Sequence, residues 1–204
     1  MKMKLYEICF SPTGGTQKAA DILSKGIADE IHTVDLTDHS TDFSAISLAG
    51  EDMAVIAVPS YGGRVPAPAI DRLKSIKGNG ALAVLVCVYG NRAYEDTLIE
   101  LLDAANDAGF TVISAVAAIA EHSIARQFAA GRPDEADRKI LAEYAGKIRE
   151  KIISGNTSQP SVPGNRPYKK GGGSARKINA VMMTAVSTML KKVCSDRKEC
   201  ELYL

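Results

Sequence analysis

Apolar residues follow two alternating patterns along the first 153 positions of the chain. Short, mainly apolar runs predict five strands, at residues 3–10, 31–36, 52–59, 81–89 and 111–120. Between these runs apolar residues recur every three or four positions, which predicts helices at residues 14–29, 66–76, 93–108 and 133–153. Several strands are apolar on both faces, so the pattern indicates an α/β fold whose parallel sheet is covered by helices on both sides.

This alternation restricts the topology of the sheet. Connections between parallel strands are right-handed, and a chain of this length suits a doubly wound five-stranded parallel sheet of order 2-1-3-4-5. In such a sheet the ligand crevice lies where the strand order reverses, between the first and third strands. We therefore expect functional residues at the carboxyl ends of the first, third and fourth strands.

The C-terminal part of the chain has a different pattern. Residues 154–173 are rich in glycine and proline and predict an extended linker, whereas residues 175–193 repeat apolar side chains at helical spacing between basic residues. We therefore divide the chain into a domain at residues 1–154 and a linker plus basic amphipathic helical tail at residues 155–204. The predicted helix can pack on the body or on a second copy in a homo-oligomer, lie on a membrane surface or act as a spacer, and we favour packing.

Charge divides the chain at the same place. The formal net charge of the 204 residues is +1, but residues 1–154 carry 16 Lys and Arg against 21 Asp and Glu, which gives −5. Residues 155–204 carry 9 Lys and Arg against 3 Asp and Glu, which gives +6. This asymmetry predicts that the tail folds back on the body or meets an acidic partner.

Composition excludes several classes of protein. With 46% hydrophobic residues the chain is too apolar for wholesale disorder, and no run approaches the roughly 20 apolar residues that span a bilayer. The N-terminus lacks the pattern of a secretory signal, so we expect a cytoplasmic protein without a transmembrane segment or a nucleic-acid partner. Cys9 and Cys87 lie in apolar runs and are expected to be buried.

The strongest local motif follows the first strand. The hexapeptide Ser-Pro-Thr-Gly-Gly-Thr leads directly from this strand into a helix. The hydroxyls of Ser11, Thr13 and Thr16 and the free N–H groups of the first helical turn can bind a phosphate. Gly14 and Gly15 let the backbone approach it closely. A helix cap with a tight turn is the ordinary alternative.

The spacing of this motif also narrows the possible ligands. It is neither the dinucleotide fingerprint GxGxxG nor the P-loop GxxxxGK followed by Ser or Thr. These absences argue against NAD as the primary ligand and against ATP chemistry.

The motif matches the phosphate loop of flavodoxins, Ser/Thr-x-Thr-Gly-x-Ser/Thr, and later segments strengthen the resemblance. Residues 59–66 (Pro-Ser-Tyr-Gly-Gly-Arg-Val-Pro) follow the third strand, and residues 89–94 (Tyr-Gly-Asn-Arg-Ala-Tyr) follow the fourth. Together with residues 121–123 and 130–134, they resemble most closely the flavodoxin domains of bacterial and archaeal proteins fused to ferredoxin-type iron–sulfur modules. The resemblance covers about residues 3–170 and implies a flavodoxin-like FMN-binding flavoprotein.

The resemblance further implies that two loops hold the flavin ring. It assigns to them Pro59, Ser60, Tyr61, Gly62 and Gly63 after the third strand and Tyr89, Gly90, Asn91, Arg92 and Tyr94 after the fourth. The tyrosines offer stacking or edge contacts, and the Gly62–Gly63 peptide matches one that reorients near flavin N5 in flavodoxins. Asn91 can bond the pyrimidine edge, and Arg64 and Arg92 can bring positive charge near it. Each residue also has an ordinary explanation as a turn or surface residue.

Two further groups of residues carry weaker signals. Glu121 and His122 close the fifth strand, farther from the expected crevice, and we favour a structural hydrogen bond over proton shuttling there. Cys194 and Cys200 are too few for the four thiolates of an iron–sulfur cube, so we expect no cluster and no metal. The chain is then either a protein without this module or a fragment of a longer fusion.

Three functions are compatible with these residues. The leading one is an FMN-dependent electron-transfer protein that works with a redox partner protein or a small-molecule acceptor. The second is an NAD(P)H-dependent FMN or quinone oxidoreductase, and the third is a cofactor-free interaction module. No residue stands out as an acid–base catalyst, which favours the carrier and leaves the assignment as an enzyme open.

Overall fold

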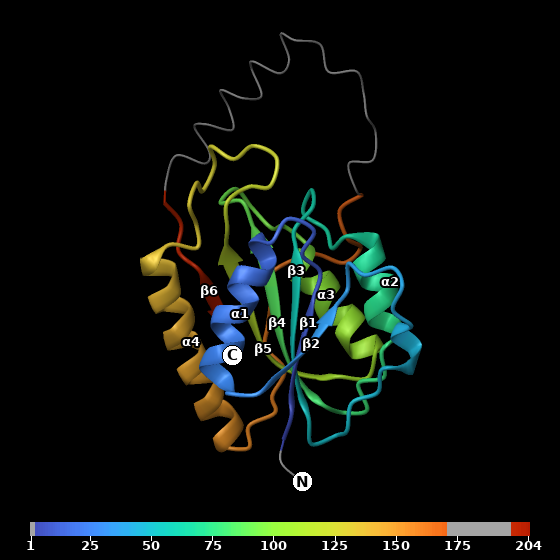
Figure 1. Cartoon of the computed structure of the whole chain (residues 1–204). Helices are drawn as coiled ribbons and strands as arrows, with labels where there is room; N and C mark the ends of the chain where they lie inside the picture. Colours follow the sequence, from blue (N-terminus) through green and yellow to red (C-terminus); the bar gives the residue numbers. More distant parts are fainter. Residues whose placement is uncertain (1–2, 171–196) are drawn as a thin grey trace.

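A sheet of six strands runs through the centre of the structure, a computed structural model that describes residues 3–170 and 197–204 (Figure 1). Its order is β2-β1-β3-β4-β5-β6, and the first five of these are parallel. Their bounds are β1 Leu5–Cys9, β2 Ile31–Asp35, β3 Met53–Pro59, β4 Leu82–Tyr89 and β5 Thr111–Ile119. The predicted strands and the order 2-1-3-4-5 are thus confirmed.

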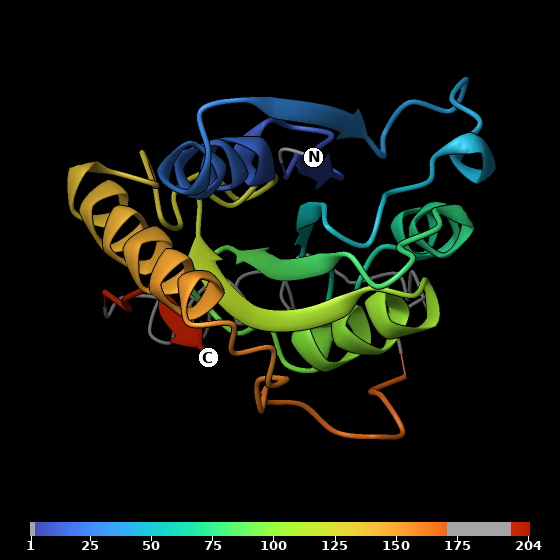
Figure 2. The same ribbon diagram turned by 90° about the horizontal axis from the view of Figure 1, so that it is seen from below.

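Helices cover both faces of this sheet, as Figure 2 shows. One face carries α1 and α4, and the other carries α2, α3 and a short 3-10 turn. Their bounds are α1 Gly15–Ile27, α2 Ala67–Ser75, α3 Thr97–Asp107, α4 Glu135–Ile153 and the 3-10 turn Phe43–Ala45. The four helices predicted from apolar spacing are therefore present, with ends that differ by a few residues.

Burial explains why the central strands are apolar on both faces. Every residue of β3 is buried, and its side chains alternate between two cores. Val55 and Ala57 face α1 and α4, whereas Ile56 and Val58 face α2 and α3. Burying each large apolar side chain contributes about 1.5–3 kcal/mol, so these strands hold their carboxyl ends firmly in place. Cys87 is likewise buried, as predicted.

The sixth strand was not predicted from the sequence. β6 comprises Glu201–Tyr203 and pairs antiparallel with β5, with Leu202 opposite Val116. Cys200 and Leu202 pack with the core under α1 and α4, and Tyr203 packs with the other core. Three residues are too few for a periodic pattern, and the strand with which they pair is distant in the sequence.

Residues 155–170, predicted as a linker, lie extended against α3 and the loop that precedes it. Asp96 in this loop accepts hydrogen bonds from the N–H groups of Asn165 (2.9 Å) and Lys169 (2.6 Å). Tyr168 packs against the core between the sheet and α3. This segment is therefore fastened to the body over much of its length.

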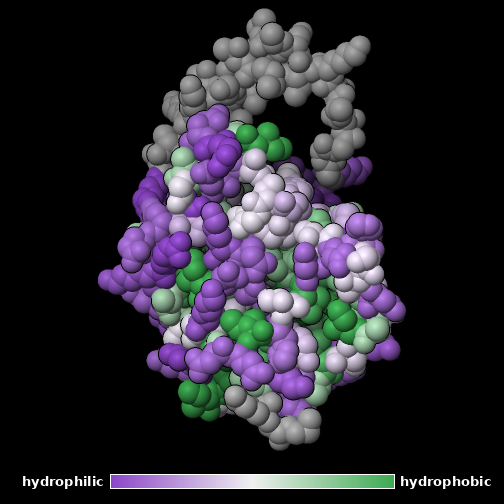
Figure 3. Space-filling model, in the orientation of Figure 1, coloured by the Kyte–Doolittle hydropathy of each residue, from purple (hydrophilic) through white to green (hydrophobic). Residues whose placement is uncertain are grey.

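The surface seen in Figure 3 is mainly hydrophilic, with apolar side chains gathered in small groups. Within residues 3–170 and 197–204, no helix combines the length and the apolar character needed to cross a bilayer. The helix predicted at residues 175–193 and Cys194 lie outside the described residues.

Candidate functional site

A cavity of about 460 Å³ opens at the carboxyl ends of β1, β3, β4 and β5, the upper end of the sheet in Figure 1. Its volume lies in the range of small-molecule sites, about 300–1,000 Å³. Nine residues proposed from the sequence line it: Thr13, Gly15, Thr16, Pro59, Ser60, Tyr61, Gly62, Tyr89 and Gly90. The crevice is therefore where the strand order predicts it.

The loop after β1 closes one end of the cavity with a tight turn. The N–H of Gly14 donates to the carbonyl oxygen of Ser11 (3.3 Å), and Gly14 has a φ of 80°, a conformation that favours glycine. The hydroxyl oxygen of Ser11 accepts the N–H of Gln17 (2.9 Å) and so caps the first turn of α1. Ser11 and Gly14 thus shape the loop without lining the cavity.

Several donors of this loop have no partner among the described residues. The first helical bond of α1 runs from the N–H of Lys18 to the carbonyl of Gly14, so the N–H groups of Gly15 and Thr16 precede the ladder. In the part of the chain that the structure describes, neither these groups nor the hydroxyls of Thr13 and Thr16 form a hydrogen bond. With the positive end of the helix dipole behind them, these donors have the chemistry that suits an anion.

The loop after β3 carries an exposed aromatic ring at the rim of the cavity. Tyr61 and Arg64 exchange backbone hydrogen bonds (2.9 and 3.3 Å) around Gly62 and Gly63, whose φ angles of 63° and 82° suit a two-residue turn with positive φ at both positions. Tyr61 is 46% exposed. Ile124, from the loop after β5, also lines the cavity and is 88% exposed. The rim thus offers two apolar side chains to a ligand.

The loop after β5 comes closer to the cavity than we expected. Seven residues that line the cavity were not proposed from the sequence. Five of them follow β5, and the other two lie after β1 and on β4: Ala120, Glu121, His122, Ser123, Ile124, Pro12 and Val88. A Cβ added at Gly15 would lie 3.6 Å from the Ala120 side chain, so the start of α1 packs on the end of β5. This packing brings the loop after β5 to the cavity. The spacing of residues along the sequence does not predict such a contact between distant segments.

Gly90 allows the loops after β4 and β5 to touch. A Cβ at this position would lie 2.7 Å from His122, a distance that real side chains do not adopt. The Nδ1 atom of His122 accepts the N–H groups of Ile124 (3.2 Å) and Ala125 (3.1 Å). His122 therefore has the structural hydrogen bonds that we favoured for it.

The rest of the loop after β4 turns away from the cavity. Asn91, Arg92 and Tyr94 do not line it. The Asn91 side-chain oxygen accepts the N–H of Lys198 (3.3 Å), and the Tyr94 hydroxyl donates to Glu201 (2.6 Å). These groups hold the C-terminal segment instead.

The two arginines expected near the ring are also engaged elsewhere. Arg64 donates to Glu100 (2.7 Å), which holds the pKa of Arg64 above its usual value, and its guanidinium lies 4.9 Å from the centre of the Tyr168 ring. Arg92 pairs with Glu95 at 2.9 Å. Neither side chain lines the cavity, and Gly63 lies outside the lining as well.

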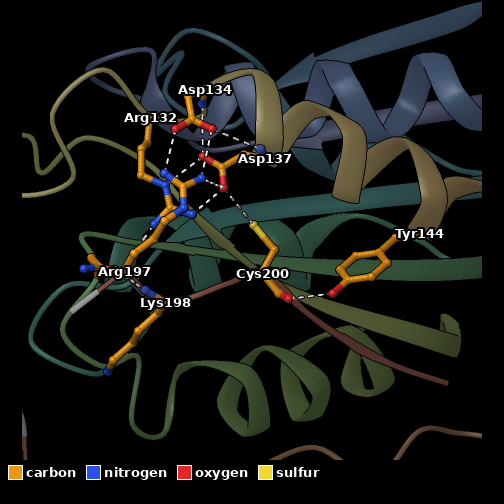
Figure 4. A network of polar contacts seen from close by, with 8 residues as sticks. Arg132, Asp134, Asp137, Tyr144, Arg197, Lys198 and Cys200 are labelled. Carbon is orange, nitrogen blue, oxygen red and sulfur yellow. Dashed lines mark hydrogen bonds and ion pairs between the residues drawn. The ribbon is translucent and has the colours of Figure 1, made fainter.

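A polar network joins the C-terminal segment to the start of α4 (Figure 4). Arg197 pairs with Asp134 (2.8 Å) and lowers the pKa of that carboxyl group. Asp134 and Asp137 form a reciprocal capping box, and Asp137 also binds the buried Arg132. The prediction that the basic tail folds back on the body is thus confirmed for residues 197–204. Within the described ranges, no group of three or more His, Cys, Asp or Glu is placed to hold a metal ion.

Comparison with known proteins gives the fold. No protein-family model matches the chain, and neither does any curated protein. A flavodoxin from Streptococcus pneumoniae TIGR4 is similar in structure, with 22% identity, a TM-score of 0.51 and coverage of 72% of this chain and 99% of that one. A flavodoxin from the domain Archaea matches with 15% identity, a TM-score of 0.51 and coverage of 74% and 99%.

Part of a larger protein is similar in structure as well. Rubredoxin oxygen:oxidoreductase from Desulfovibrio gigas matches with 14% identity and a TM-score of 0.52 over 74% of this chain and 36% of that one. These likenesses, together with the strand order and the placement of the cavity, show that the chain has a flavodoxin-like fold.

Proposed function

We propose that the chain binds FMN in the cavity at the carboxyl ends of β1, β3, β4 and β5 and acts as a cytoplasmic electron-transfer protein. The observation that carries this proposal is the set of unpaired donors at Gly15, Thr16 and Thr13, which faces one end of a cavity with Tyr61 at its rim. FMN has a terminal phosphate at one end and a flat, largely apolar ring at the other, so its two ends match the two ends of the cavity.

The donor set suits a phosphate monoester. Among the described residues that line this cavity there is no Lys or Arg, so binding would depend on N–H and O–H donors and on the helix dipole. Hydrogen bonds to a charged group each contribute about 1.5–3 kcal/mol. Four such donors therefore account for strong binding of the phosphate end.

The rim supports the ring end of the ligand. Tyr61 and Ile124 offer apolar surface, and the chain bends at Gly62 and Gly90 without side chains that would fill the space. Bound FMN supplies one- and two-electron chemistry at its ring. The chain would bind and orient it and leave an edge accessible to a redox partner.

The titratable side chains of the cavity favour a carrier over a substrate enzyme. Glu121 is paired with Arg126 (2.6 Å), and His122 accepts two backbone N–H groups. Hydrogen bonds from Gly131 and Arg126 hold the pKa of Glu121 below its usual value. These contacts hold Glu121 in its charged form and use the Nδ1 atom of His122 for backbone hydrogen bonds. The amino-acid sequences of the loops at residues 59–66 and 89–94 further support a relationship with the flavodoxin domains of iron–sulfur fusion proteins.

The test is a titration of the apoprotein with FMN, in which quenching of the flavin fluorescence measures binding. Thr13→Val with Thr16→Val removes two hydroxyl donors at nearly constant volume, and we expect FMN to bind on the order of 100-fold or more weakly. Thr33→Val, an exposed threonine on β2, is the matched control and should leave affinity unchanged. Failure of the native protein to bind FMN, or unchanged affinity in the double variant, would contradict the proposal.

Mixing the FMN-loaded protein with NADPH separates the carrier from the reductase. A carrier without a nicotinamide site keeps its absorbance near 450 nm, whereas a reductase loses it within minutes. Rapid bleaching would replace electron carriage with the oxidoreductase function.

A further inference from the structure

A second cavity, of about 440 Å³, adjoins the first beyond the loop after β1. The two share Thr13, Gly15, Glu121 and Ser123 in their linings and are therefore contiguous at the proposed phosphate end. Unlike the first, the second is lined by basic side chains: Lys18, Arg126, Arg132 and Arg138.

Two of these four cations are neutralised within the chain. Arg126 pairs with Glu121 (2.6 Å), and the buried Arg132 pairs with Asp137. For the side chains of Lys18 and Arg138, by contrast, no hydrogen bond or ion pair occurs among residues 3–170 and 197–204. With Glu121 and Asp137 counted against the four cations, an excess of about two positive charges remains at the cavity, and Lys18 is also close enough to Glu121 to lower the pKa of that carboxyl group.

The wall behind these charges is firmly built. Asp137, which is fully buried, binds Arg132 through both carboxylate oxygens (Figure 4). The Asn91 side chain accepts from the same guanidinium at 3.4 Å. On the other side, Glu121 accepts the N–H of Gly131 (2.9 Å) and so closes the loop after β5. The positions of the lining residues are therefore defined by contacts that do not involve Lys18 or Arg138.

The two unpaired cations that line the cavity come from two different helices. Lys18 belongs to the first turn of α1 and Arg138 to the first turn of α4, and these helices pack against each other. Ammonium and guanidinium groups at the starts of two helices favour an anion, and guanidinium suits phosphate geometry in particular. A volume of about 440 Å³ leaves room for more than a single phosphate.

We propose that the second cavity binds a phosphoryl group of a nucleotide, next to the phosphate site at residues 11–16. The phosphoryl group can belong to the same ligand, as the second phosphate of a flavin dinucleotide, or to a separate nucleotide bound beside FMN. Its placement beside a flavin depends on the proposed function, whereas the anion site itself does not.

Calorimetric titrations with four probes test the proposal and identify the source of the phosphate. FMN and FAD are added to the apoprotein, and ADP and inorganic phosphate are added to both the apoprotein and the FMN-loaded protein. Tighter binding of FAD than of FMN indicates a tethered phosphate, and binding of ADP to the FMN-loaded protein indicates a separate nucleotide. In either case the double variant Lys18→Gln with Arg138→Gln should bind the ligand that carries the second phosphate, FAD or ADP, at least tenfold more weakly. Its affinity for FMN should change less than threefold.

The control is Lys139→Gln, which removes an exposed positive charge adjacent in sequence to Arg138 but outside both linings. It should affect no probe. Three results would overturn the proposal: no preference for FAD together with no binding of ADP, an equal loss of FMN and FAD affinity in the double variant, or binding of inorganic phosphate or ADP that the double variant leaves unchanged. If FMN fails to bind but ADP binds and depends on Lys18 and Arg138, only the proposed function is wrong.

Discussion

The loops after β1 and β4 lie at the same end of the sheet, yet their polar groups are used differently. The N–H groups of Gly15 and Thr16 have no partner in the described chain. The side chains of Asn91, Tyr94 and Asp96, by contrast, bind the C-terminal segments at residues 155–170 and 197–204. Polar groups at a cavity that lack a partner indicate a ligand, whereas paired ones indicate scaffolding.

This difference follows from the cost of burying polar groups. A polar group withdrawn from water needs a hydrogen-bond partner, and either the chain or a ligand can provide it. In the loop after β4 the partners come from residues much later in the chain, such as Lys169 and Lys198. A sequence motif does not include such partners, so both loops resemble ligand-binding loops when only their residues are considered.

Two carboxyl groups extend the comparison to electrostatics. Glu7 on β1 lies beneath the start of α1, and burial raises its pKa, with the nearby Asp21 adding to the effect. Asp96, before α3, has its pKa lowered, chiefly by the N–H of Lys169 and then by that of Asn165. The two regions should therefore respond to pH in opposite directions.

The largest effect on stability is expected for Asp96→Ala, which removes the acceptor of two backbone N–H groups. Hydrogen bonds to charged groups contribute about 1.5–3 kcal/mol, so we expect urea denaturation at pH 7 to show a loss of about 2–3 kcal/mol. Because the pKa of Asp96 is lowered on folding, its contribution is present above the unfolded value near 4 and disappears as pH falls. The stability difference between the variant and the native protein should therefore shrink as pH falls below the unfolded value and through the lowered folded pKa.

The exposed Asp71 on α2 provides the matched control, since Asp71→Ala should change stability by less than about 0.5 kcal/mol. FMN affinity of Asp96→Ala should stay within threefold of the native value. An Asp96→Ala protein of native stability would mean that residues 155–170 are not fastened through this loop.

A smaller effect of opposite sign is expected for Glu7→Gln. The pKa of Glu7 is raised on folding from its usual 4.5, so the folded protein holds this proton more tightly than the unfolded chain. Stability therefore falls as pH rises above about 4.5 through the folded pKa. Glutamine keeps an acceptor for Gln17 without a charge, so we expect a gain of about 1 kcal/mol at pH 8 and little difference below pH 4.

Thermal or urea unfolding from pH 3 to pH 8 measures this effect, with the exposed Glu51→Gln as control. A loss of stability at pH 8 in Glu7→Gln would show that the charged form is the favoured one. The comparison of the two carboxyl groups would then no longer hold.

The sequence was informative where partners are adjacent and uninformative where they are distant. The strand, turn and helix around residues 11–16 are contiguous, so Thr13, Gly15 and Thr16 could be assigned to the cavity in advance. Ala120 and Ile124 could not, because the packing of α1 on the end of β5 brings them there. The sixth strand was not predicted for the same reason, because β5, with which it pairs, is distant in the sequence.

The smallest effect is expected for Arg92→Gln, and it tests the comparison most directly. Arg92 is 42% exposed and pairs with Glu95 at 2.9 Å, an arrangement that contributes at most about 1 kcal/mol. If its guanidinium is directed to Glu95, FMN affinity should change less than twofold and the reduction potential of the bound flavin should not change. Arg149→Gln, an exposed substitution on α4, controls for net charge. A tenfold loss of affinity or a lower potential in Arg92→Gln alone would place this charge beside the ring, and the loop after β4 would then bind ligand as the loop after β1 is proposed to do.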